Sequence, residues 1–233
     1  MTPRTRAELI LAARQRADME TSLFVGASEA VDMLMQSWHE LYDLLIEAYG
    51  EAYFEITNSV SVAANATGFD LTSLVTNTES FQFYKLSAVR LVIGDGEFQL
   101  DREERRATRT VTARSWDWYF RPTYRIEGMF LRWLPPPASA VTVLVSWVPM
   151  PQELTSDLDL LPQQAQPWEE YLIVDWAIKA MQKEESDVSM LMARKDQITE
   201  RIRKMAPRDI GTPAIISRVD GANGSLRGGG WGS

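Results

Sequence analysis

The spacing of apolar residues changes twice along this chain of 233 residues, and these changes constrain its fold more than any other feature. Up to Gly50, apolar residues recur every three or four positions, which is the period of an amphipathic helix. From Tyr53 they alternate with polar residues, as in a half-buried strand, and helical spacing returns at Pro167. The sequence therefore predicts helices on both sides of a β region.

Two helices are expected before the β region. The first begins at Thr5, because Glu8 follows at the spacing of a capping box, and it runs to about Ala17. The second begins after Ser28 as its N-cap and ends near Gly50 as its C-cap. Its apolar face comprises Val31, Leu34, Trp38, Leu41, Tyr42, Leu45 and Tyr49, and its polar face comprises Glu29, Asp32, Gln36, Glu40, Asp43 and Glu47.

Short strands separated by turn signals are expected from Tyr53 to about residue 150. The segments are "YFEITNSVSVAA", "KLSAVRLVI", "GEFQL", "TYRIEG", "FLRWL" and "AVTVLVSWV". The turn "GDG" at 94–96 would join two of them as a hairpin, and "LPPPASA" breaks the chain after residue 134. Strands this short favour an antiparallel sheet over alternating β-α-β units.

Two more helices are expected after the β region. The third starts with Pro167 at its first position and is apolar on most sides, so it should lie centrally. The short break "SD" predicts an antiparallel hairpin with the fourth helix. The apolar stripe of the fourth helix comprises Val188, Leu191, Met192, Ile198, Ile202 and Met205.

These elements predict an α+β fold in which N- and C-terminal helices form a helical bundle, with an antiparallel β region inserted between them in the sequence. The predicted parts are an N-terminal helical part at 1–52, the β domain at 53–150, a helical hairpin at 151–205, and an extended C-terminal arm with a glycine-rich tail at 206–233. The apolar "AII" of the arm suits an external groove, although residues 213–219 folding back on their own domain is an equal alternative.

Charge is distributed unevenly along the sequence. Between Arg16 and Lys85 there are eleven Asp or Glu residues and no Lys or Arg, whereas the rest of the chain has a small net positive charge. This asymmetry predicts a directional partner surface, or a face that must not adhere to something anionic. The alternative is a solvated acidic helix.

Composition excludes many kinds of site. The chain has no Cys and a single His, which removes disulfides, thiolate nucleophiles, cysteine metal sites and multi-histidine metal sites. His39 precedes Asp43 by four positions, so a helical side-chain pair is expected rather than a catalytic role. The usual phosphate-loop, dinucleotide, hydrolase and zinc-protease motifs are missing from the sequence. We expect no cofactor, no metal and no enzymatic activity.

The sequence also shows neither a signal peptide nor a membrane-spanning segment. No run of about 18 apolar residues occurs, and the N-terminus is charged where a signal peptide would be apolar. A soluble protein that is made in a cytoplasm and has no membrane partner is therefore expected.

Two charged or aromatic segments have alternative interpretations. "DREERRATR" at 101–109 contains paired carboxylates, but neighbours on one element cannot face each other across a scissile bond, so a short amphipathic helix is expected. "SWDWYFRPTYR" at 115–125 could stack nucleic-acid bases, although aromatic pairing in a sheet core is the favoured explanation.

The ordered set of "ILAARQRADMETS", "ELYDLLIEAYGEAYF", "FYKLSAVRL", "YRIEGMFLRWLPPP", "PWEEYLIVDWAIKAMQKEESDVSMLMARKDQITERI" and "RDIGTPAII" resembles the head-to-tail adaptor, or connector, proteins of tailed bacteriophages, especially short-tailed phages. The resemblance extends from residue 7 to about residue 220. It implies a structural virion protein at the neck: a dodecameric ring under the portal that extends the DNA channel and carries further neck or tail proteins. Genomic DNA would pass through without sequence recognition.

Two functional surfaces are expected for such a ring, the first from the resemblance and the second from electrostatics. The arm would bind the portal protein through Arg208, Ile210, Pro213, Ile215 and Ile216. The acidic face of the second helix, formed by Glu29, Asp32, Glu40, Asp43 and Glu47, would line the channel, because repulsion of phosphates keeps DNA mobile. The alternatives are a stopper or tail-completion ring protein and a carbohydrate-binding or carbohydrate-cleaving virion protein.

Overall fold

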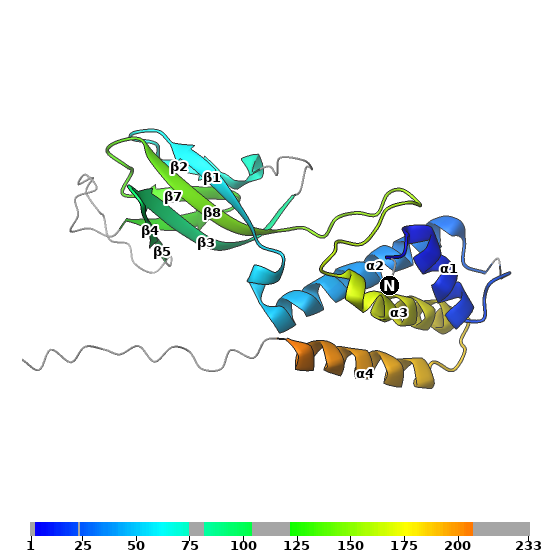
Figure 1. Cartoon of the computed structure of the whole chain (residues 1–233). Helices are drawn as coiled ribbons and strands as arrows, with labels where there is room; N and C mark the ends of the chain where they lie inside the picture. The colour runs from blue at the N-terminus through cyan, green and yellow to red at the C-terminus, as the bar shows by residue number, and fades with distance from the viewer. Residues whose placement is uncertain (1–2, 23, 75–81, 104–121, 207–233) are drawn as a thin grey trace, which may run out of the picture.

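The computed structural model describes residues 3–22, 24–74, 82–103 and 122–206, and it has a mixed α+β fold with four α-helices and two sheets. Helices and strands occupy opposite ends of the molecule (Figure 1). The two ends have separate hydrophobic cores. We call them the helical body and the β body.

Local sequence signals fix the start of the first helix and the end of the second. α1 (Arg6–Arg16) has the predicted capping box, in which the Thr5 hydroxyl accepts from the Glu8 backbone and the Glu8 carboxylate accepts from the Thr5 backbone. α2 (Ala27–Tyr49) ends at Gly50, whose φ of 83° is the left-handed value that favours glycine. Its start differs from the prediction: Gly26 is the N-cap and Ser28 lies inside the helix.

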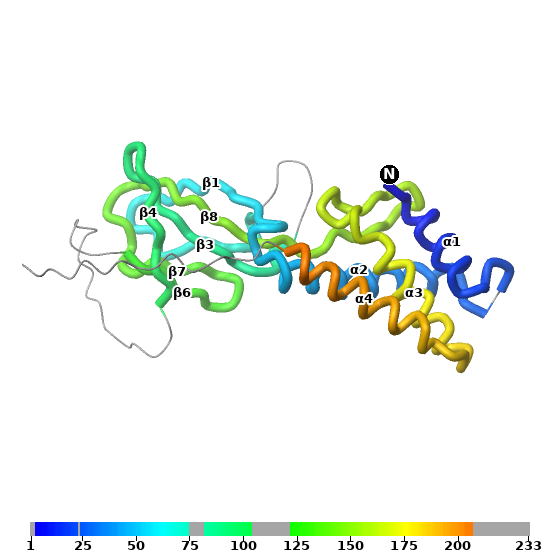
Figure 2. The backbone as a smooth tube through the Cα atoms, turned by 60° about the horizontal axis from the view of Figure 1, so that its bottom comes forward, coloured from blue at the N-terminus to red at the C-terminus, as the bar shows by residue number. Residues whose placement is uncertain are grey.

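The other two helices complete the helical body. A 3-10 turn (Gln166–Trp168) contains Pro167 and leads into α3 (Glu169–Lys183), most of which is buried, as predicted. α4 (Ser189–Met205) runs alongside α2 and α3 (Figure 2). Residues from all four helices, together with the segment after the last strand, share one core. The predicted apolar stripe of α4 is only partly right, because Ile198 and Ile202 are buried whereas Met192 and Met205 are exposed.

Two four-stranded sheets enclose the core of the β body. One has the order β1 (Ile56–Val62), β8 (Val141–Pro149), β3 (Phe83–Ile93), β4 (Gly96–Gln99), and the other has the order β2 (Gly68–Asp70), β7 (Phe130–Leu134), β6 (Thr123–Glu127), β5 (Asp101–Arg102). The six predicted strands are all present, and β3 and β4 form the hairpin expected at "GDG".

The β body departs from the predictions at two strands. β2 was not expected, and β5 lies where a short helix was expected. β5 also pairs parallel with β6, whereas the other strand pairs are antiparallel. The expected helix is therefore wrong at Asp101–Arg102, and its remainder from residue 104 lies outside the described residues. Pairing with β6 is a tertiary contact that helical propensity could not reveal.

Aromatic side chains connect the two bodies. The Tyr42 ring of α2 stacks on Phe54, with ring centroids 4.3 Å apart, and meets Tyr84 of β3 edge-on. Its hydroxyl donates to the carbonyl of Pro149 at 2.6 Å. The Trp38 indole likewise donates to the carbonyl of Gln152 at 3.0 Å. The aromatics of the segment 37–54 thus join α2 to the start and the end of the β body.

Replacing Tyr42 by Phe should lower the free energy of unfolding by about 1–2 kcal/mol, because the buried Pro149 carbonyl loses its donor while the ring packing stays. Chemical denaturation of both chains measures the change. Tyr53→Phe is the matched control, since the Tyr53 hydroxyl also donates to a carbonyl, that of Gln164, but at an exposed site. Equal losses for the two variants would contradict a special role of the Tyr42 bond.

Candidate functional site: the acidic face of α2

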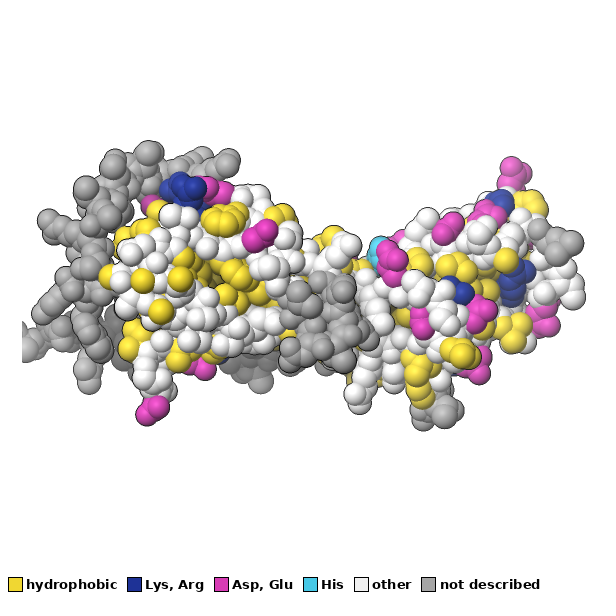
Figure 3. All heavy atoms as spheres, turned by 90° about the horizontal axis from the view of Figure 1, so that it is seen from above, with side chains coloured by type: hydrophobic (Ala, Val, Ile, Leu, Met, Phe, Trp, Pro, Cys, Tyr) yellow, Lys and Arg dark blue, Asp and Glu magenta, His cyan; other side chains and the backbone are white. Residues whose placement is uncertain are grey.

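The five carboxylates that the sequence singled out follow α2 along its length. Asp32, Glu40, Asp43 and Glu47 are exposed, and Glu29 is half-buried. They face outward because the opposite side of the helix supplies buried residues to the core. Seen in Figure 3, acidic and hydrophobic side chains are interspersed on the surface of the helical body.

Most of these carboxylates have cationic partners on α3 and α4. Glu29 pairs with Lys183 at 2.7 Å, and Glu47 pairs with Arg203 at 3.4 Å. Glu40 contacts Lys179 at 2.9 Å and Lys195 at 3.1 Å. The charge asymmetry of the sequence is therefore compensated to a large extent within the chain, between residues roughly 155 positions apart.

A buried aspartate lies at the centre of these ion pairs. The side chain of Asp175 on α3 is 3% exposed, and its two oxygens bind Lys179 and Lys195, each at 2.6 Å. Lys179 also contacts the hydroxyl of buried Ser37 at 3.0 Å, and Lys195 lies over the ring of Tyr171. This cluster was not predicted from the sequence, although Asp175 and Lys179, four positions apart in an apolar helix, were a signal for it.

The surroundings of Asp175 favour its ionised form. Burial raises the pKa of Asp175, but hydrogen bonds from Lys179, Lys195 and Ser37 outweigh burial, so the pKa lies below its usual value. For Lys195, burial lowers the pKa, and the hydrogen bond and charge of Asp175 more than reverse this, so the pKa is raised. The cluster therefore holds α2, α3 and α4 together as charged groups.

The other two carboxylates of the acidic face, Asp32 and Asp43, have no cationic partner among the described residues. Asp43 accepts a hydrogen bond from the Tyr84 hydroxyl at 3.1 Å, and Asp32 forms no ion pair with another described residue. His39 is exposed, and the expected pair with Asp43 is not among the contacts of the described chain. Asp32 and Asp43 thus keep negative charge that no cation offsets within the described chain.

A cleft lies between α1 and the beginning of α2. Its volume is about 560 Å³. Ile10, Leu11 and Val31 form its apolar lining, and Arg6 and Arg14 are among its polar lining residues. Arg6 contacts Asp157 at 2.5 Å, and its buried Nε has no hydrogen-bond partner among the described residues. Arg14 donates to the carbonyls of Ser22 and Val25 and has no carboxylate partner in the described chain. Asp157 also lines the cleft, so the charge of Arg6 is neutralised there, and the cleft combines apolar walls with the positive charge of Arg14.

The other predicted sites are only partly described. The arm residues Arg208, Ile210, Pro213, Ile215 and Ile216 lie outside the described residues. Of the aromatic segment 115–125, Tyr124 is described, and it is buried in the β core, where it cannot stack on a base. Within the described ranges, no group of three or more His, Asp or Glu side chains could hold a metal ion.

Comparisons of the sequence with protein-family models and with curated proteins give no match. None of the helices in the described part of the chain is both long and apolar enough to cross a membrane.

Proposed function

We propose that this protein is a structural, non-enzymatic component of a tailed-phage virion, a head-to-tail adaptor that forms a ring under the portal. The observation that carries the proposal is the partition of the fold: helices from before and after the strands share one core, and the strands have another. This partition agrees with the helical bundle and inserted β region that the resemblance implies, and the extended C-terminal arm is part of the proposal. The ring would extend the DNA channel and support further neck or tail proteins.

In this proposal the outward face of α2 lines the channel. Pairing of Glu29, Glu40 and Glu47 with cations makes the lining weakly negative, and Asp32 and Asp43 supply its remaining charge. A weak repulsion is sufficient to prevent adhesion of DNA, because adhesion depends on neutralising phosphates with Lys or Arg.

The mass of a purified portal ring, measured by mass photometry with and without this protein, tests the proposal. We expect the mass to rise by the whole number of subunits that completes a ring, dodecameric in the resembling family. A portal mass that stays constant at micromolar protein would contradict the adaptor function. Binding to a preformed adaptor ring instead would identify a stopper.

A further inference from the structure

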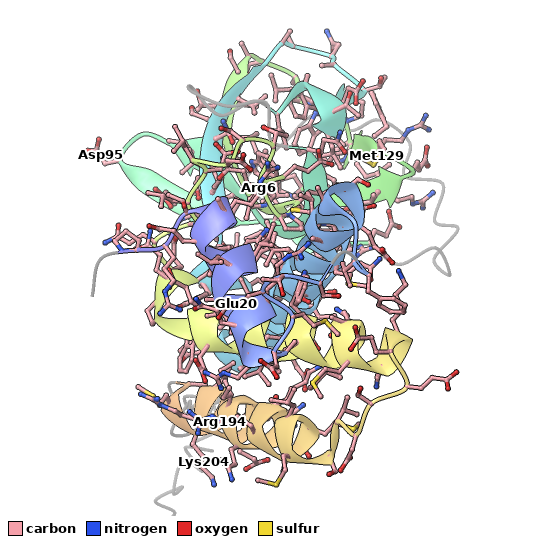
Figure 4. All side chains as sticks on the ribbon, turned by 90° about the vertical axis from the view of Figure 1, so that its right-hand side faces the viewer. Arg6, Glu20, Asp95, Met129, Arg194 and Lys204 are labelled. Atoms are coloured by element: carbon pink, nitrogen blue, oxygen red, sulfur yellow. The ribbon has the colours of Figure 1, made fainter. Side chains whose placement is uncertain are left out.

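Two exposed features of the helical body lie at different places around α3. One is the cleft between α1 and α2, on the α1 side. The other is the corner where α3 turns into α4, at residues 184–190. α1 and α4 both pack on α3, and Figure 4 shows Arg6 of α1 on one side of it and Arg194 and Lys204 of α4 on the other.

The α3–α4 corner presents a methionine among carboxylates. Met190, the second residue of α4, is 83% exposed, the largest exposed fraction among the big hydrophobic side chains of the described residues. Glu184 and Glu185 are exposed beside it, and neither carboxylate forms an ion pair with a described residue. Asp187, just before the N-cap residue Val188, accepts a hydrogen bond from the Ser189 backbone at 2.9 Å. The corner therefore presents one exposed apolar side chain on a segment that is rich in carboxylates.

The cleft has the complementary character. Leu11, 51% exposed, and Ile10 and Val31 provide apolar contact. The Arg14 guanidinium donates to the carbonyls of Ser22 and Val25 and has no carboxylate partner in the described chain, so it favours a negative group. The α2 N-terminus already has one, because the Glu29 carboxylate accepts a hydrogen bond from the Gly26 backbone. A methionine is flexible enough to fill such a cleft.

We propose that Met190 of one copy inserts into the α1–α2 cleft of the next copy, with Glu184 and Glu185 near Arg14. Because each copy uses two different surfaces, the contact is heterologous and repeats around a ring when the rotation closes. The inference rests on the proposed function, since it supplies the contact between neighbouring subunits of that ring.

Cysteine cross-linking of the full chain tests the contact, because the natural sequence contains no Cys. The double variant Leu11→Cys/Met190→Cys is mixed with portal rings, oxidised mildly and run on a non-reducing gel. We expect a reducible ladder of multimers. The matched control is Leu11→Cys/Met205→Cys, because Met205 is 58% exposed at the other end of the same helix, and we expect no ladder from it.

Each outcome has a definite meaning when the mass of the portal complex is measured on the same samples. A rise in mass without a ladder, or an equal ladder from the Met205 control, overturns the contact and leaves the adaptor function standing. A ladder from Leu11→Cys/Ile215→Cys in place of Met190 shows that the arm occupies the cleft, which also overturns it. If neither mass nor ladder appears, the contact and the proposed function both fail.

A pair of single substitutions gives a second measurement. Met190→Asp should raise the concentration for half-maximal loading of the portal by roughly tenfold or more, because a short, hydrated carboxylate replaces the apolar side chain that fills the cleft. Aspartate near a helix N-terminus is tolerated, so the fold should persist. Met205→Asp should leave loading unchanged, and equal effects of the two variants would overturn the proposal.

Discussion

Deletion of residues 206–233 is expected to abolish attachment to the portal while the folded body is retained. The described core supports retention, because its last member along the chain is Ile202 and α4 ends at Met205. Attachment should be lost because, in our proposal, the arm residues Arg208, Ile210, Pro213, Ile215 and Ile216 make the portal contact. Because a few residues usually carry most of the binding energy of an interface, removing all of these contact residues should have a large effect.

Mass photometry with portal rings and thermal unfolding of the truncated chain measure the two halves of this prediction. The matched control is deletion of residues 221–233, which removes the glycine-rich tail and keeps the proposed contact residues. We expect this shorter deletion to attach normally. Unimpaired attachment of the chain that lacks residues 206–233 would refute the role of the arm, and a lowered unfolding temperature would show that the arm supports the fold.

Much of the fold could be predicted because its signals are local. The capping box at Thr5 and Glu8, the left-handed Gly50 and the "GDG" turn each depend on residues a few positions apart. The apolar positions of α2 also predicted its buried face, with Leu34, Trp38 and Leu41 in the core.

The missed features depend on contacts between distant segments. β5 exists because Asp101 and Arg102 pair with β6, and nothing in those residues indicates a strand. The acidic residues of α2 suggested an external partner or a solvated helix, whereas Glu29, Glu40 and Glu47 meet cations of α3 and α4. Spacing gives the face of a helix that carries a charge, but it does not give the helix that packs beside it.

Replacing Asp175 by Asn should lower the free energy of unfolding by about 3 kcal/mol, because it leaves two lysines without their buried counter-ion. The loss lies at the lower end for buried pairs, since Lys179 and Lys195 are 20% and 28% exposed and both retain Glu40. Asp32→Asn is the matched control, as Asp32 has no ion pair with a described residue, and it should change stability by less than about 0.5 kcal/mol.

The triple variant Asp175→Leu/Lys179→Met/Lys195→Met separates the value of the ion pairs from the cost of breaking them. Replacing a buried charge cluster by apolar side chains is often neutral, so its free energy of unfolding should return to within about 1 kcal/mol of the natural chain. A loss as large as that of Asp175→Asn would show that the hydrogen bonds themselves, and not an uncompensated charge, determine the stability.

The pH dependence of the loss in Asp175→Asn identifies its origin. The pKa of Asp175 is lower in the folded state than its ordinary value of about 3.9. The ionised carboxylate therefore contributes fully to the free energy of unfolding above that pH, and this contribution declines as the pH falls through the folded pKa. The raised pKa of Lys195 gives the opposite limit. The charged lysine contributes fully to the free energy of unfolding below about pH 10.4, and this contribution is lost as the pH rises through the folded pKa.

Urea denaturation at several pH values measures the difference in free energy of unfolding between the natural chain and Asp175→Asn. This difference should be constant near neutral pH and shrink in acid. A difference that stays constant down to pH values where Asp175 is protonated would mean that the asparagine disturbs packing, not charge.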